Sequence, residues 1–184
     1  LNHDVQRIER LITDYSQILK DEVALSREKM KKVNLKLVVS SVVDDFNSIY
    51  EAKRGIKIIL KDARNQEEYF INGIENRIEQ IIANLLDNSI SFSDDNQNIS
   101  VEIQQDEQEN VILRVVDEGK GFKETSTKKI FDRFYSNRPD NFGEHSGLGL
   151  NIVKNLVDLH GAMINASNNT GQKGANVEII FPKL

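Results

Sequence analysis

The sequence predicts an α+β fold, a two-layer sandwich in which a mixed β-sheet carries helices on one face. Two patterns favour this class. Four segments carry apolar residues at helical spacing, and six shorter segments alternate apolar and polar residues as strands do. The expected strands also come in consecutive pairs, whereas a wholly parallel sheet would alternate single strands with helices.

The first helical segment spans residues 1–30 and contains neither proline nor glycine. Its apolar residues alternate spacings of four and three: Leu1, Val5, Ile8, Ile12, Tyr15 and Leu19, with Leu11, Ile18 and Leu25 beside them. This face is wider than a two-stranded coiled-coil seam and favours a helical bundle. We therefore predict one long stalk helix within residues 1–33 and a domain over 34–184; the alternative is a helix that packs on this domain.

The domain is expected to contain a helix over residues 34–54, strands Ile56–Leu60 and Glu68–Ile71, a helix Asn76–Phe92, strands Ile99–Ile103 and Val111–Val116, a loop over 118–146, a helix Leu148–His160, and strands Ala162–Ala166 and Asn176–Phe181. Gly55 and Gly161 follow helices, where glycine is the favoured C-terminal residue. Asn76 and Glu79 resemble a capping box, which would start the second of these helices at Asn76. The first two strands flank a polar turn.

Composition narrows the function classes. Hydrophobic residues make up 39% and charged residues 29%, which is typical of a chain that folds. The net charge of -5 argues against nucleic acid or an anionic membrane as the main partner. The absence of cysteine excludes disulfides and thiolate metal sites. The chain begins at Leu1, so we expect a piece of a longer protein.

Amide side chains follow one face of the predicted helix Asn76–Phe92. Gln80, Asn84 and Asn88 repeat at a spacing of four, opposite the apolar residues. Exposed helix faces usually carry Glu and Lys, which form helices better than Asn does. Because amide oxygens suit Mg²⁺, this face is a candidate metal site; a merely solvated polar face is the alternative.

Two glycine motifs flank the long loop. Asp117 ends a strand and is followed by Gly119 and Gly121, so a sharp turn could bring backbone close to a flat ligand while Asp117 accepts from an exocyclic amine. Gly147 and Gly149 open the next helix, where free N–H groups and the helix dipole favour phosphate. Neither motif has the residues of a Walker A loop or of the dinucleotide fingerprint.

An aromatic cluster, Ile130 to Tyr135, interrupts the polar loop between the glycine motifs. A long loop between two ligand-facing motifs is typical of a lid, and Arg133 and Arg138 could then reach a terminal phosphate. The alternative is a small satellite core with surface arginines.

Taken together and in this order, these segments resemble the nucleotide-binding domain shared by sensor histidine kinases, Hsp90, MutL and DNA gyrase, the Bergerat or GHKL fold. Asn84 to Asn88 resemble the kinases' N box, Asp117 to Gly121 the G1 box, Phe131 to Tyr135 the F box and Gly147 to Leu150 the G2 box. The first helix resembles the second helix of the dimerisation and phosphotransfer bundle. Residues 3–7 and 136–139 resemble ChvG-type alphaproteobacterial kinases.

The resemblance implies ATP and Mg²⁺ as ligands. It assigns the metal to Asn88 with Asn84, the adenine amine to Asp117, and catalytic roles to Asn84, Gln80, Arg133 and Arg138. The implied nucleotide contacts are Asn84, Asn88, Asp117, Gly119, Gly121, Phe131, Phe134, Ser146, Gly147, Leu148, Gly149 and Leu150.

The resemblance also implies transfer of the γ-phosphoryl group to a histidine on a helix of the same or the partner protomer, outside this chain. ATPases of the superfamily carry Glu where this chain has Asn84, which favours phosphoryl transfer over hydrolysis. A GHKL-type ATPase and a non-catalytic regulatory module remain alternatives; Ser91, in place of the usual Lys, supports the second. His3 lacks the Pro that follows the phosphoacceptor, and His145 and His160 are expected to be structural.

The expected protein is thus the cytoplasmic portion of a membrane-anchored bacterial kinase. It would form a homodimer when complete, act on a response regulator and bind no nucleic acid.

Overall fold

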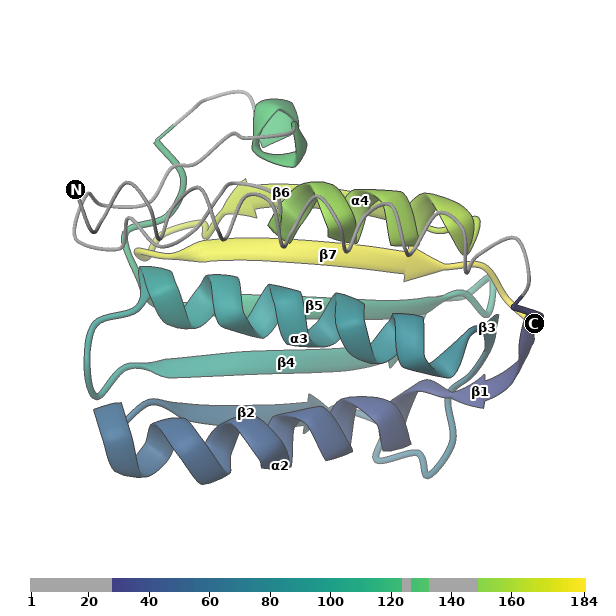
Figure 1. Ribbon diagram of the computed structural model, residues 1–184, viewed down its shortest axis with the longest axis horizontal. Helices are drawn as coiled ribbons and strands as arrows, with labels where there is room; N and C mark the ends of the chain where they lie inside the picture. The colour runs from purple at the N-terminus through teal and green to yellow at the C-terminus, as the bar shows by residue number, and fades with distance from the viewer. Residues whose placement is uncertain (1–27, 124–126, 133–148) are drawn as a thin grey trace, which may run out of the picture.

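The computed structural model describes residues 28–123, 127–132 and 149–184 (Figure 1). The expected stalk helix lies outside these residues except for positions 28–30, which have no regular secondary structure. Among the described residues, no helix is long and apolar enough to span a bilayer.

A five-stranded sheet with the strand order β2-β4-β5-β7-β6 forms one layer of the molecule (Figure 1). Its strands are β2 (Lys57–Asp62), β4 (Asn98–Gln105), β5 (Val111–Asp117), β6 (Met163–Asn168) and β7 (Ala175–Phe181). The β2–β4 pair is parallel and the other three pairs are antiparallel, so the predicted mixed sheet is confirmed.

Three helices cover one face of this sheet: α2 (Leu35–Arg54), α3 (Glu75–Phe92) and α4 (Gly149–Leu159) (Figure 1). The core between the layers consists of aliphatic side chains, among them Val39, Val43, Ile78, Ile82, Leu86, Val153 and Val157 from the helices and Ile99, Val101, Leu113, Val177 and Ile179 from the sheet. Each such side chain contributes about 1.5–3 kcal/mol through burial. The predicted α+β sandwich is therefore confirmed.

A separate two-stranded sheet pairs β1 (Lys31–Asn34) with β3 (Phe70–Gly73), in antiparallel register. The sequence analysis did not predict β1, whose four residues include one apolar side chain, Val33, and so show no strand alternation. Residues 31–33, which the predicted boundary leaves with the stalk, belong to this strand.

The segment between β2 and β3 leads away from β2 and toward the start of α2. Tyr69 is 2% exposed, and its hydroxyl donates to Asp62 Oδ1 at 2.5 Å. The Tyr69 backbone N–H donates to Asn34 Oδ1 at 3.0 Å, and its carbonyl accepts from Leu35 N at 2.8 Å. These bonds hold β3 beside β1, so β2 is free to pair in parallel with β4.

The start of α3 is not the predicted capping box. The helix begins at Glu75, one residue before Asn76, and its N-cap is Ile74, which has no side-chain cap. The Ile74 N–H instead donates to Nε2 of His160, at 3.1 Å. Nδ1 of the same ring lies 2.6 Å from the Leu156 carbonyl oxygen, so Nδ1 carries the proton and Nε2 accepts.

His160 thus joins the beginning of α3 to the end of α4 as a neutral ring, and its predicted structural role is consistent with this geometry. The side chain is 5% exposed, and burial lowers the pKa of His160 despite the bond to the Leu156 carbonyl. The neutral form is therefore the one that the fold stabilises.

We predict that the free energy of unfolding falls as the pH drops below about 6.5, because unfolded His160 binds a proton that the buried ring excludes. Neutral His160 makes its full contribution to the free energy of unfolding above this ordinary pKa. Below it the contribution decreases, by at most about 1.4 kcal/mol per pH unit. His160→Gln can offer one acceptor and one donor but does not titrate. Urea unfolding between pH 5 and 8 should give a flatter profile for this variant, and equal profiles would contradict the prediction.

Candidate functional site

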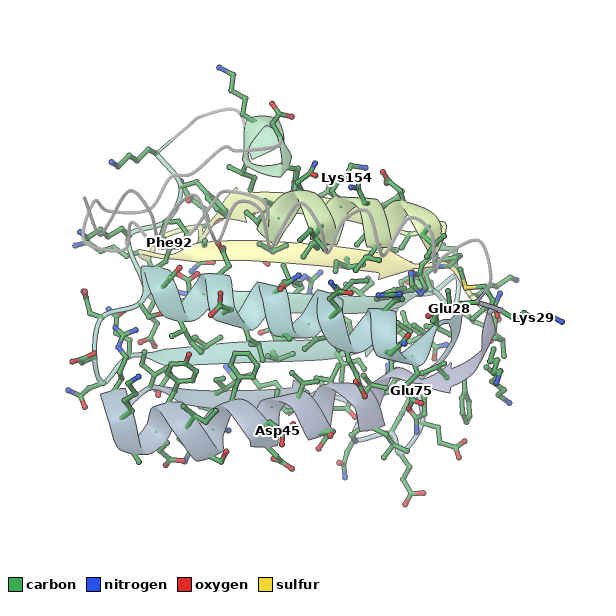
Figure 2. The ribbon with its side chains drawn as sticks, viewed as in Figure 1. Glu28, Lys29, Asp45, Glu75, Phe92 and Lys154 are labelled. Carbon is green, nitrogen blue, oxygen red and sulfur yellow. The ribbon has the colours of Figure 1, made fainter. Side chains whose placement is uncertain are left out.

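The sequence motifs meet at one end of the sandwich, where α3, β5 and β6 end and α4 and β7 begin (Figure 1). Figure 2 shows Phe92 at this end of α3 and Glu75 at the opposite end. The antiparallel pairing of β5 with β7 places the last residues of β5 beside the first residues of β7. Residues far apart in the sequence therefore surround Asp117.

Asp117 is the buried acid of this site. Its side chain is 3% exposed, and Oδ1 accepts hydrogen bonds from the backbone N–H groups of Gly119, at 2.9 Å, and Ala175, at 3.1 Å. Burial raises the pKa of Asp117, while these two amides act in the opposite direction. Oδ2 accepts no hydrogen bond from the residues that the structure describes, so one carboxylate oxygen is held by backbone amides and the other is not.

Two glycines let the backbone approach Asp117 from both sides. A Cβ on Gly119 would overlap the Phe92 carbonyl oxygen, and a Cβ on Gly174 would overlap the Asp117 carbonyl oxygen. Gly174 also has a φ of +120°, a backbone conformation that residues with a side chain rarely adopt. The close contact with Phe92 brings the last turn of α3 against the Asp117–Gly121 loop.

The amide face of α3 leads to this contact. Asn88 lies one turn before Phe92 and is 8% exposed, and Asn84 lies one further turn back and is partly buried. Gln80 accepts a hydrogen bond from Arg77 Nη1 at 3.3 Å, and Arg77 also pairs with Glu28 at 3.2 Å. The structure therefore places Asn88 near the Asp117 loop and Gln80 two turns farther away, in a network with the first turn of α3.

Two asparagines that the sequence analysis missed hold the same loop. Asn168 Oδ1 accepts from Phe122 N at 2.7 Å, and its Nδ2 donates to Phe122 O at 3.0 Å. Asn169 Nδ2 donates to Asp117 O at 2.9 Å. The available signal was a polar pair before a glycine in a predicted hairpin, which is also typical of an ordinary turn.

The described part of the aromatic cluster packs against α4. A short 3₁₀-helix, η1 (Thr127–Phe131), buries Ile130 to 1% exposure, and Phe131 packs against the core. Asn151 Nδ2, in the first turn of α4, donates to Phe131 O at 3.0 Å. The start of the predicted lid is thus attached to the helix that Gly149 and Leu150 begin.

Comparison with known proteins identifies the domain. Residues 73–184 match the protein family described as "Histidine kinase-, DNA gyrase B-, and HSP90-like ATPase". The chain belongs to this ATPase-like family. The predicted family is therefore confirmed, and the chain carries an ATP-binding catalytic domain of the type found in two-component sensor kinases.

Curated relatives of this ATPase-like domain are sensor proteins. The chain is 33% identical over 180 residues to the sensor protein ChvG of Rhizobium meliloti, a match that covers 95% of the chain and 31% of the relative. It is 27% identical over 183 residues to the sensor protein kinase PmrB of Pseudomonas aeruginosa, covering 100% of the chain and 37% of the relative. The chain thus spans about a third of these relatives, and the predicted similarity to ChvG is confirmed.

Solved structures support the fold. The catalytic domain of the histidine kinase ThkA aligns with a TM-score of 0.73 at 24% identity, covering 85% of this chain and 99% of that one. ThkA in complex with the response regulator protein TrrA aligns with a TM-score of 0.75 at 24% identity, and the alignment covers 96% of this chain and 48% of the ThkA chain.

Several predicted site residues of the ATPase-like domain lie outside the described residues, and their roles stay predictions. They are Arg133, Phe134, Arg138, Ser146, Gly147 and Leu148, together with the histidines His3 and His145. Ser91 is described: it is 6% exposed, and its hydroxyl donates to the Asn88 carbonyl oxygen at 2.7 Å.

Gly174→Ala should destabilise the domain by about 2–4 kcal/mol, because the new methyl group overlaps the Asp117 carbonyl and the backbone conformation is strained. Gly171→Ala is the matched control in the same hairpin. Gly171 has a φ of +75°, but no atom of the described residues lies within 4 Å of an added Cβ, so only strain of about 1 kcal/mol is expected. Urea unfolding measures the free energy of unfolding of both variants. If both lose the same amount of stability, the contact with Asp117 costs nothing.

Proposed function

We propose that this domain binds Mg-ATP between the end of α3, the Asp117 loop and the start of α4, and that the complete protein transfers the γ-phosphoryl group to a histidine outside this chain. The observation that carries the proposal is the Asp117 carboxylate. One oxygen is fixed by two backbone amides, and the other is left for a donor such as the adenine amine. A buried carboxylate with a spare acceptor suits a neutral amine that donates.

The phosphates would lie toward α4. The helix has 11 residues and begins at Gly149, so its first N–H groups and its dipole favour an anion there. Among the residues that the structure describes, none has an atom within 4 Å of a Cβ added at Gly149, which is consistent with a ligand approaching the backbone there. The net charge of -5 does not prevent phosphate binding, because salt screens distant charges and the attraction comes from the nearby helix start.

The residues present fit Mg²⁺ as an oxygen-bound ion. Among the described residues, no group of three or more His, Cys, Asp or Glu side chains could hold a metal. Mg²⁺ is commonly bound through one or two protein oxygens plus substrate phosphates and water, and Asn88 with Asn84 can supply those protein oxygens. Bound there, the ion would neutralise charge on the phosphates.

The chemistry then depends on position and electrostatics. Phosphoryl transfer needs an aligned donor and acceptor and stabilisation of charge on the transferred group, and the protein's own groups supply both. Asn84 cannot act as a general base because a carboxamide has no basic form at neutral pH, so it does not activate water as a Glu would. This favours transfer to an incoming histidine over hydrolysis.

The relatives support a wider proposal. ThkA has been solved in complex with the response regulator TrrA, and ShkA in complex with AMPPNP. We infer that this protein likewise takes ATP, receives its phosphoryl group on a histidine-bearing helix and passes it to a response regulator. A homodimer anchored in a membrane, with this domain on the cytoplasmic side, would suit such a sensor.

Asn88→Ala should remove most of the Mg²⁺-dependent part of ATP affinity, a loss of about tenfold or more, because it deletes an oxygen ligand. Asn88→Asp is the matched variant: it keeps an oxygen at the same place and should retain the Mg²⁺ dependence. Titration calorimetry with Mg²⁺ and with a chelator measures the difference. If Asn88→Ala keeps the full Mg²⁺ dependence in a folded domain, the metal assignment is wrong.

The chain alone should bind ATP and ADP yet become phosphorylated far below one group per chain, because its acceptor histidine is absent. Radiolabelled ATP, followed by acid treatment that cleaves phosphohistidine, tests this. Adding the full-length protein disabled by Asn88→Ala should restore labelling on that protein. Efficient labelling of His3 in the chain alone would contradict the assignment of the acceptor, and steady phosphate release without a partner would favour an ATPase.

A further inference from the structure

The turn that joins β6 to β7 contacts the Asp117 loop through two carboxamides. Asn168 is the last residue of β6 and Asn169 follows it. Both side chains bond backbone atoms of residues 117–122, which lie more than 40 positions earlier in the chain. The turn is therefore a partner of the loop, in addition to being a connection between strands.

The Asn168 side chain bonds Phe122 as a neighbouring strand would. Its carboxamide accepts from the Phe122 N–H and donates to the Phe122 carbonyl, so one rigid planar group satisfies both backbone groups of one residue. The Phe122 ring is 6% exposed and meets Phe92 edge-on, with centroids 6.3 Å apart. Asn168 thus fixes the end of the loop where it joins the core.

Asn169 acts at the beginning of the loop. Its Nδ2 donates to the Asp117 carbonyl at 2.9 Å and to the Lys173 carbonyl at 3.2 Å, and its backbone N–H donates to Gly174 O at 2.9 Å. These bonds close the turn on itself and attach it to the backbone of Asp117. They also hold Ala175, whose N–H is one of the two donors to Asp117 Oδ1.

The orientation of the Asp117 carboxylate depends on both contacts. Oδ1 is held by Gly119 N and Ala175 N. Gly119 lies in the loop between the two points that Asn169 and Asn168 fix, and Ala175 lies in the strand that the turn begins. If the turn shifted, both donors would move relative to the carboxylate.

We propose that Asn168 and Asn169 are positioning residues that aim the free oxygen of Asp117 at the exocyclic amine of adenine. The inference rests on the proposed function, since it assumes that Asp117 accepts a hydrogen bond from this amine. It predicts that the two asparagines determine how strongly the site prefers a purine with the amine over one without it, and that they leave phosphate and metal binding unchanged.

The test compares the affinities of the chain for Mg-ATP and for Mg-purine riboside triphosphate, which lacks the amine. Asn168→Ala and Asn169→Ala should each weaken ATP binding by about fivefold to tenfold, as loss of a well-aligned hydrogen bond does, and leave the affinity for the analogue within about twofold. Asn165→Ala is the matched control. Asn165 lies on the same strand and is exposed, and its side chain makes no hydrogen bond to the residues that the structure describes, so both affinities should stay unchanged.

Asn168→Asp separates the two bonds of that side chain. It keeps an acceptor for Phe122 N–H but places a carboxylate oxygen against Phe122 O, so it should reduce the preference for ATP at least as much as Asn168→Ala. Thermal unfolding reports whether each variant is folded. If Asn168→Ala does not fold, Asn169→Ala provides the same comparison.

The ratio of the two affinities decides the outcome. A reduced preference for ATP in the folded variants supports the proposal. If both affinities fall by the same factor, or if neither affinity changes, the proposal is overturned, and the asparagines have a structural role alone. If the unsubstituted chain binds both nucleotides equally, or if Asp117→Ala leaves the preference intact, the amine contact of the proposed function fails, and this result is distinct because it does not involve the asparagines.

Discussion

The site depends on how one buried carboxylate is held. The Asp117 side chain is almost fully buried, and its burial is tolerated because two backbone N–H groups converge on one of its oxygens. Those N–H groups belong to different segments, one directly after β5 and one at the start of β7. Pairing between the two strands is therefore a condition for the geometry of the acid, and the sheet and the site form together.

The glycines near Asp117 follow from the same constraint. For two backbone amides to reach one oxygen, the chain must pass close to the Asp117 carbonyl and to the end of α3, where a Cβ has no room. The helix that presents Asn88 is thus in contact with the loop that presents Asp117. One compact end of the domain thus contains the acid, the amides and the helix start to which the proposed function assigns the adenine amine, the metal and the phosphates.

Much of this arrangement could be predicted from local pattern. Helices α2, α3 and α4 and the sheet strands have strong periodicity, and the motifs in their order along the chain indicated the family. Predictions that depend on non-local contacts were less successful. The polar strand β1 forms because β3 is beside it, α3 begins at Glu75 because His160 satisfies the Ile74 amide, and Asn168 and Asn169 have a role only because Phe122 and Asp117 lie opposite them. None of these partners is close in sequence, so no periodicity could reveal them.

The parallel pairing of β2 with β4 has a consequence for how the chain acquires its structure. β2 lies at the edge of the sheet, and its neighbour β4 follows only after β3 and the 18 residues of α3. During synthesis, α2 and β2 leave the ribosome before the strand that completes them. Their apolar side chains remain exposed until β4 emerges, and closing so long a loop is slow compared with forming a hairpin. The segment from α2 to β2 therefore keeps apolar surface exposed until β4 has been synthesised.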